Sequence, residues 1–129
     1  MRTAAQELGD AAEALVAESL AAAGWTVHAR NVRVGRHELD LIATDPGPPR
    51  TLVFVEVRWR ARRDFGLAEE TVDRRKRSHL RTAALRLLSE PETAATVGVE
   101  LPRVPRLPIR FDLIVVEPGG RVRHHPHGA

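Results

Sequence analysis

The sequence contains no cysteine, which excludes a disulfide framework and a thiolate metal site and is compatible with a reducing cytoplasm. It has only five aromatic residues, Trp25, Trp59 and three phenylalanines, and this scarcity disfavours the binding of single-stranded nucleic acid by base stacking. No segment reaches the roughly 20 consecutive apolar residues that a membrane-spanning helix needs. The early acid Glu7 and the lack of an apolar run argue against a signal peptide. We therefore expect a cytoplasmic globular protein without membrane contact.

A length of 129 residues suits one domain with one core, so we expect a single domain over residues 1–129. The net charge is +3 and the sequence pI is about 10.8. Residues 58–86 contain ten lysine and arginine residues but only four acidic ones, so the positive charge is concentrated. A concentrated basic segment favours a polyanionic partner.

Two segments, residues 36–43 and 52–58, alternate apolar and polar residues, which is typical of β-strands. The proline- and glycine-rich residues 45–50 between them predict a turn, and hence an antiparallel hairpin. A register with Thr44 opposite Leu52 also sets Asp40 opposite Glu56, with their Cβ atoms roughly 5 Å apart.

Two carboxylates at that distance repel each other unless a cation lies between them. Oxygen ligands at a sheet surface suit Mg²⁺ or Mn²⁺. Strand carboxylates that pair with arginines are an equally good explanation of Asp40 and Glu56, and these two residues alone do not decide between the alternatives.

A first helix is predicted for residues 3–23, ending at Gly24. Glu13 lies on the flank of its apolar stripe, either as a carboxylate at the rim of the core or as an acid directed at the sheet. The predicted stripe consists of Ala5, Leu8, Ala12, Leu15, Ser19 and Ala23.

A second helix is predicted for residues 69–89, with acids in its first turns as the helix dipole favours. Lys76 falls in the middle of its apolar stripe. It either pairs with carboxylates on the sheet or lays its aliphatic stem over the core. The predicted stripe consists of Val72, His79 or Leu80, Ala83 and Leu87.

Further strands are expected at residues 25–34 and 109–117. The proline-rich residues 90–108 predict a loop, and we expect a flexible tail over residues 118–129. The three histidines of the tail could hold a metal, but a flexible polar tail is more often solvated. The predicted order is αβββαβ, an α/β fold in which helices pack on a mixed sheet.

Asp40, followed by Glu56-Val57-Arg58 and an inward Lys76, looks like the PD-(D/E)xK nuclease signature. The chain resembles more specifically the YraN-like family of uncharacterised bacterial proteins, which are similar to archaeal Holliday-junction resolvases. The matching blocks cover most of the chain from Gly9 to Val116. They are residues 9–13, 20–25, 30–33, 38–43, 52–57 and 65–66, then 70–72 with Lys76 and Leu80, and 110–112.

The resemblance implies a restriction-endonuclease-like core in which Mg²⁺ or Mn²⁺ is bound by Glu13, Asp40 and Glu56. The carbonyl of Val57 would be a further ligand, and Glu13 would bind a second ion or its water. The implied catalytic set is Asp40, Glu56, Arg58 and Lys76.

Two residues depart from the family pattern. His37 stands where a glycine is usual, and Arg58 replaces the lysine of the Glu-x-Lys motif. Arginine is not deprotonated in proteins, so Arg58 can contact a phosphate but cannot act as a general base.

The leading interpretation is a metal-dependent endonuclease acting on double-stranded or branched DNA, for which the resolvase analogy also allows a homodimer. One alternative is a nuclease-fold protein that binds DNA but has lost cleavage through Arg58, and another is a protein-interaction domain with no DNA affinity. The basic residues expected to contact DNA phosphates are Arg33, Arg36, Arg62, Arg63, Arg74, Arg75, Arg77 and Arg81.

Overall fold

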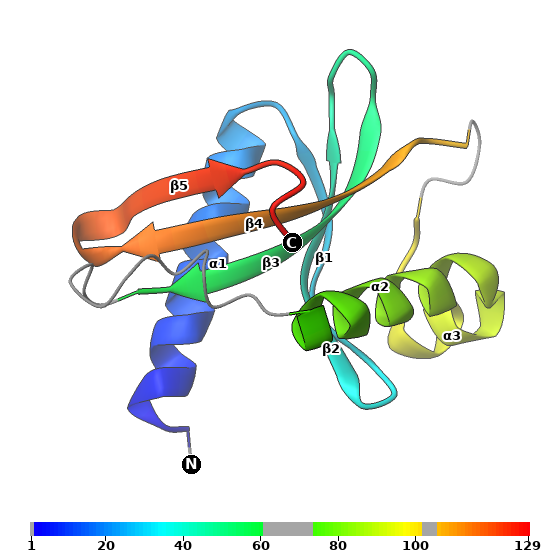
Figure 1. Cartoon of the computed structure of the whole chain (residues 1–129), viewed down its shortest axis with the longest axis horizontal. Helices are drawn as coiled ribbons and strands as arrows, with labels where there is room; N and C mark the ends of the chain where they lie inside the picture. Colours follow the sequence, from blue (N-terminus) through cyan, green and yellow to red (C-terminus); the bar gives the residue numbers. More distant parts are fainter. Residues whose placement is uncertain (1, 61–73, 102–105) are drawn as a thin grey trace.

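A computed structural model describes residues 2–60, 74–101 and 106–129 of the chain. Within these ranges, three α-helices and five strands follow one another in the order α1, β1, β2, β3, α2, α3, β4 and β5 (Figure 1). The αβββαβ order and the mixed sheet expected for a restriction-endonuclease-like core are confirmed, with α3 and β5 as additions. Within the described ranges, each helix is too short or too polar to cross a membrane.

The first helix, α1 (Ala4–Ala22), begins with a capping box between Thr3 and Gln6. The predicted stripe was wrong in its orientation, because Leu8 is 44% exposed. The helix buries a neighbouring face instead, formed by Ala12, Glu13, Val16 and Leu20. The predicted stripe was drawn largely through alanine and serine, whereas burying Val16 and Leu20 removes more apolar surface from water.

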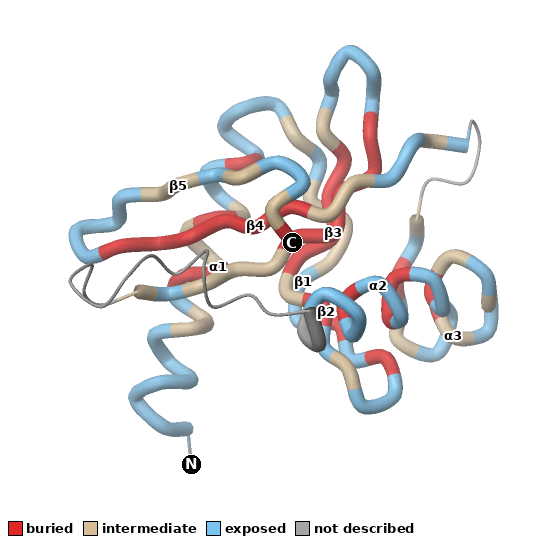
Figure 2. Tube along the Cα trace, viewed as in Figure 1, coloured by how far each residue is buried: buried red, intermediate tan, exposed pale blue. Residues whose placement is uncertain are grey.

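The sheet has the strand order β1-β2-β3-β4-β5, with β3 and β4 parallel and the other neighbours antiparallel. Its strands are β1 (Thr26–Val34), β2 (His37–Asp45), β3 (Thr51–Trp59), β4 (Ile109–Glu117) and β5 (Arg121–His125). Buried segments concentrate along β4 and the middle of the sheet (Figure 2).

Each face of the sheet has its own apolar cluster. On one face, Val16 and Leu20 of α1 pack with Leu41 and Val55. On the other face, residues of α2 and α3 pack with Leu39, Ile42 and Phe54. Figure 1 shows α2 and α3 well apart from α1. The central strand β3 therefore lies between two helical layers.

The register between β2 and β3 is the predicted one, with Thr44 opposite Leu52. This ladder ends at the pair of Leu41 with Val55, one residue before Asp40. Leu39 and Leu41 pack in opposite clusters, so the regular alternation of β2 breaks between them. The strand irregularity therefore coincides with Asp40.

The helix predicted for residues 69–89 is observed as α2 (Arg74–Ser89), and residues 69–73, with Val72 of the predicted stripe, lie outside the described part. Leu80, Ala83 and Leu87 are buried as predicted, whereas His79 is exposed and its ring stacks on His37.

The loop predicted for residues 90–108 was wrong, because it contains α3 (Pro91–Val97). Pro91 is compatible with this helix, because the first turn of a helix tolerates proline, whose missing N–H has no partner there in any case. The helix ends at Gly98, which has the left-handed φ of 72° that glycine adopts readily.

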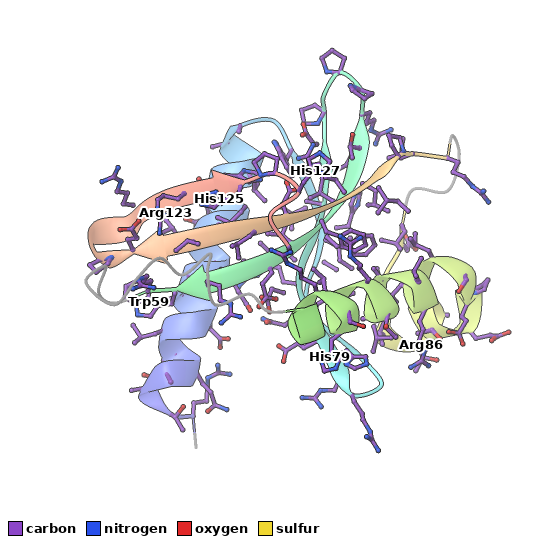
Figure 3. The ribbon with its side chains drawn as sticks, in the orientation of Figure 1. Trp59, His79, Arg86, Arg123, His125 and His127 are labelled. Carbon is purple, nitrogen blue, oxygen red and sulfur yellow. The ribbon has the colours of Figure 1, made fainter. Side chains whose placement is uncertain are left out.

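The flexible tail predicted for residues 118–129 was also wrong. Residues 118–120 form a short 3-10 turn, and β5 pairs with β4 from Leu113 to Glu117. Arg123 of β5 forms an ion pair with Glu117, and Figure 3 shows Arg123 and His125 on this strand. The polar composition indicated solvation, but strand pairing uses the backbone and does not require apolar side chains.

Candidate metal-binding site

Asp40 lies where β2 and β3 separate. Its Oδ2 atom accepts a hydrogen bond of 2.9 Å from the backbone N–H of Val57 on β3. The carboxylate thus accepts an N–H of β3 just beyond the last ladder pair, Leu41 with Val55. This contact holds Asp40 between β2 and β3, the two strands of the predicted hairpin.

Glu13 reaches the same place from α1 and is only 8% exposed. Burial raises the pKa of Glu13, while hydrogen bonding with the side chains of Asp40 and Asn31 acts in the other direction. The Oε2 atom of Glu13 is buried and has no hydrogen-bond partner among the residues described. Of the two alternatives for Glu13, the structure supports the acid directed at the sheet.

The environment of Asp40 opposes its ionisation. Burial is the main cause that raises its pKa to about 7, and the charge of Glu13 adds to this effect. The Val57 N–H and a side-chain hydrogen bond with Glu56 act in the other direction. A carboxyl group with this pKa near neutral pH either shares a proton with a neighbour or accepts a cation.

Glu38 is a third acid at this position, which the sequence analysis did not include among the metal-site residues. Carboxylate oxygens of Glu13, Glu38 and Asp40 lie within 4.8 Å of one another. The register of the predicted hairpin would set Glu38 opposite Arg58, but the ladder between β2 and β3 ends before Glu38, at the pair of Leu41 with Val55. The available signal was the spacing of Glu38 and Asp40, because residues i and i+2 share a face of a strand.

Glu56 and Arg58 approach Asp40 from β3. Hydrogen bonding with Glu56 favours the ionised form of Asp40, and the Oε1 atom of Glu56 lies 3.4 Å from Arg58 Nε. The Arg58 side chain is 21% exposed, and its buried Nη2 atom has no hydrogen-bond partner within the described ranges. Lys76 lies in α2 one turn before Leu80, but its side chain is outside the described part of the structure.

The predicted basic residues differ in their surroundings. Arg33, Arg36 and Arg77 are exposed. Arg81 lies 4.3 Å over the ring of Phe111 and also donates a 3.5 Å hydrogen bond to the carbonyl of Ala129, so its guanidinium already has protein contacts. The residues Arg62 and Arg63, and the side chains of Arg74 and Arg75, lie outside the described part.

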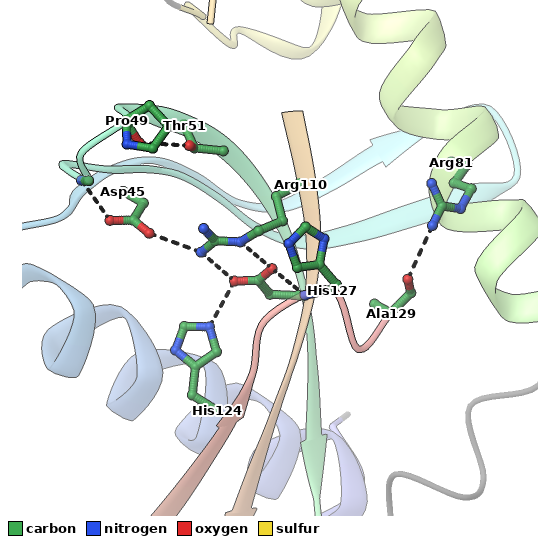
Figure 4. A network of polar contacts seen from close by, with 10 residues as sticks. Asp45, Pro49, Thr51, Arg81, Arg110, His124, His127 and Ala129 are labelled. Atoms are coloured by element: carbon green, nitrogen blue, oxygen red, sulfur yellow. Dashed lines mark hydrogen bonds and ion pairs between the residues drawn. The ribbon is translucent and has the colours of Figure 1, made fainter. Parts of the chain in front are cut away.

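A second polar cluster surrounds Asp112, which is fully buried on β4 (Figure 4). Its carboxylate accepts hydrogen bonds from Arg110, from the His124 ring and from the backbone N–H of His127. Burial alone would raise the pKa of Asp112, but these hydrogen bonds hold it at about 2. Arg110 also bonds Asp45 on β2, so the cluster ties three strands together.

The donor set around Asp40 fits a divalent cation of the magnesium class. Its side-chain donors are carboxylate oxygens, which hard cations prefer, and one of them is a buried oxygen without a partner in the described structure. The residues that could hold such an ion come from α1, β2 and β3, so the fold assembles them from distant parts of the sequence.

Comparison with known proteins adds the family. The model of the uncharacterised protein family UPF0102, which is the YraN family, matches residues 12–116. The chain is 43% identical over 121 residues to a UPF0102 protein of Symbiobacterium thermophilum, covering 92% of this chain and 90% of that protein. It is 34% identical over 129 residues to one from Pelotomaculum thermopropionicum, covering 98% and 96%. The predicted resemblance to the YraN-like family is confirmed.

Proposed function

The chain belongs to the uncharacterised protein family UPF0102, and we propose that it is a Mg²⁺- or Mn²⁺-dependent nuclease that hydrolyses DNA phosphodiesters. The observation that carries this proposal is the cluster of acids around Asp40, whose carboxylate lies within 4.8 Å of oxygens of Glu13 and Glu38 and whose pKa is also influenced by Glu56. Such a group of acids costs folding energy through burial and mutual repulsion. A bound cation would offset both costs, which supports a metal-binding role for this cluster.

The residues that would hold the ion are Asp40, Glu13 and Glu56, with the carbonyl of Val57 as a further ligand. A bound Mg²⁺ or Mn²⁺ would supply Lewis acidity, which favours attack of water on a phosphodiester. The Val57 N–H keeps the Asp40 carboxylate in place. Burial of Glu13 on α1 fixes the opposite side of the site.

Arg58 would stabilise the negative charge that develops on a phosphate during cleavage. Its guanidinium stays protonated, so it cannot remove a proton from water. The contact with Glu56 at 3.4 Å holds it beside the acids. Lys76 on α2 would be a supporting polar residue.

Exposed Arg33, Arg36 and Arg77 would contact DNA phosphates without reading the sequence. Backbone contacts of this kind suit double-stranded or branched DNA, in which the bases are stacked inside. The few aromatic residues of the chain fit the same class of substrate.

A second candidate function is DNA binding without cleavage, and the observation that favours it is the ion pair of Arg58 with Glu56. Where the family pattern has a titratable lysine, this chain has a permanent cation that partly neutralises one of the site acids. Binding would then persist through the exposed arginines while hydrolysis is lost.

The test is a cleavage assay on linear and four-way-junction DNA with Mn²⁺, comparing the wild type with Asp40→Asn and Glu13→Gln. The matched control is Glu18→Gln, the same chemical change at an exposed position of α1. Cleavage by the wild type and by Glu18→Gln, but not by the two site variants, supports the nuclease. DNA binding without any cleavage leaves the second candidate, and no affinity even at low salt contradicts both.

A further inference from the structure

We propose that Glu38 is a further carboxylate ligand of the divalent ion, in addition to the residues named above, and that it acts together with Glu13 and Asp40 on the side of the sheet that α1 covers. This inference rests on the proposed function, because it assumes that the site binds an ion. It goes further by assigning the ion to a particular set of oxygens.

The geometry of β2 brings the Glu38 carboxylate to the ion position. Oxygens of Glu13, Glu38 and Asp40 lie within 4.8 Å of one another, a spacing that a single ion could bridge after small side-chain rotations. The three residues are graded in exposure: Glu13 is buried, Asp40 is intermediate and Glu38 is exposed. Glu13 would therefore bind the ion from the protein interior, and Glu38 would bind it on the side that faces solvent.

The ordinary role of a strand carboxylate does not account for this position. The residue directly opposite Glu38 across the ladder is Arg33, a cation that would be its usual partner. The Glu38 oxygen lies instead beside two other carboxylates, where it raises the pKa of Glu13 by charge repulsion. Without a cation, this arrangement is unfavourable.

A separate observation points to a ligand at the same place. Glu13 is more than nine-tenths buried, and its Oε2 atom has no hydrogen-bond partner in the part of the chain that the structure describes. A buried carboxylate oxygen normally accepts a hydrogen bond or coordinates a metal. Coordination of an ion shared with Glu38 and Asp40 would satisfy that oxygen.

Glu56, which is also among the proposed ligands, connects this site to Arg58. It approaches Asp40 from β3 and contacts Arg58, so it lies between the acids and the guanidinium. The site then has an acidic side, formed by Glu13, Glu38 and Asp40, and a basic side at Arg58. A phosphate could meet the ion on one side and the guanidinium on the other.

The test is Mn²⁺ binding followed by electron paramagnetic resonance at pH 8, where the Asp40 carboxyl is ionised. The variants are Glu38→Gln, Asp40→Asn and the control Asp10→Asn. Asp10 is a close match for Glu38, because it also raises the pKa of Glu13 by charge but is not one of the three clustered acids. Melting temperatures without metal verify that each variant is folded.

We expect Glu38→Gln to weaken Mn²⁺ binding about tenfold or more, as loss of a ligand does, and Asp10→Asn to weaken it much less. Without metal, Glu38→Gln should melt at a higher temperature than the wild type, because one repulsive charge is gone.

Equal Mn²⁺ affinities for Glu38→Gln and Asp10→Asn, with binding abolished in Asp40→Asn, would overturn the assignment of Glu38 but leave the proposed metal site in place. Absence of Mn²⁺ binding by the wild type would overturn the proposed function and this inference with it.

Discussion

Glu13 of α1 and Asp40 of β2 bring carboxylate oxygens within 4.8 Å of each other, although both are acids and 26 residues of sequence separate them. Two carboxylates this close repel each other less when one of them carries a proton. Burial favours that proton, because it raises the pKa of both groups. A bound divalent cation would displace the proton, so pH and metal ions would both change the charge state of these two carboxyl groups.

The first prediction concerns stability against pH. The pKa of Asp40 is about 7 in the folded chain and 3.8 ordinarily, so the folded state binds more protons between these values. The free energy of unfolding of the protein should therefore fall as pH rises from about 4 to 7. Asp40 contributes up to ~1.4 kcal/mol per pH unit to this fall. Urea denaturation of the wild type and Asp40→Asn in metal-free buffer measures this, and parallel pH profiles would contradict it.

The second prediction concerns metal-induced stability. At pH 8, Mn²⁺ at about 100 times its dissociation constant should raise the free energy of unfolding by about 2.7 kcal/mol, because it binds only the folded site. Asp40→Asn should show almost no increase. Glu18→Gln should respond like the wild type, and a similar response of all three proteins would place the ion elsewhere.

The third prediction concerns Arg58. Arg58→Lys should raise the Mn²⁺-dependent cleavage rate, because it restores a group that can lose its proton beside Glu56. A general base contributes ~10²-fold or more, which sets the scale of the gain. The pH profile of the rate is the decisive measurement. A rate that is unchanged or lower at every pH would mean that Arg58 serves the structure of the site.

The fourth prediction concerns DNA affinity. Arg77→Ala should weaken binding similarly for all DNA sequences and lower the salt dependence by about one unit of log–log slope, as loss of one phosphate contact does. The matched control is Arg86→Ala on the same helix, where the arginine is paired with Glu90 at 3.1 Å. Fluorescence anisotropy at several salt concentrations measures both. A loss that depends on sequence would contradict a purely phosphate-contacting role.

The fifth prediction concerns the Asp112 cluster. Asp112→Asn should lower the free energy of unfolding by roughly 3 kcal/mol, because it leaves the charge of the partly buried Arg110 with less compensation. The exposed Glu92→Gln on α3 should change it by less than about 0.5 kcal/mol. Because the pKa of Asp112 is lowered to about 2, its stabilisation should also be lost as pH falls from about 4 to 2. Denaturation at pH 6 and pH 3 tests both statements.

Local patterns were enough to predict the hairpin and its register. Thr44 opposite Leu52 follows from alternation and from a turn of fixed length, and both are properties of short sequence segments. The two-faced burial of β3 also follows from its apolar residues. The burial of Glu13 depended on how α1 is rotated about its axis, which is set by contacts with β3 that periodicity alone does not define.

Other features needed tertiary information. The break in β2 lies at Asp40, where the ladder with β3 has ended, and a regular hairpin does not predict it. His124 of β5 bonds Asp112, a residue on another strand. In both cases the partner of a polar residue lies far along the chain, where a local pattern does not show it.

The short strand β5 also has a consequence for how copies of this protein behave in solution. Leu113, Ile114, Val115 and Val116 of β4 are at most 1% exposed, and β5 completes the hydrogen bonding on their outer side. A chain shortened after Gly120 would leave β4 as an apolar sheet edge that invites pairing between molecules. By covering this edge, the mostly polar strand β5 (Arg121–His125) thus protects the protein against aggregation.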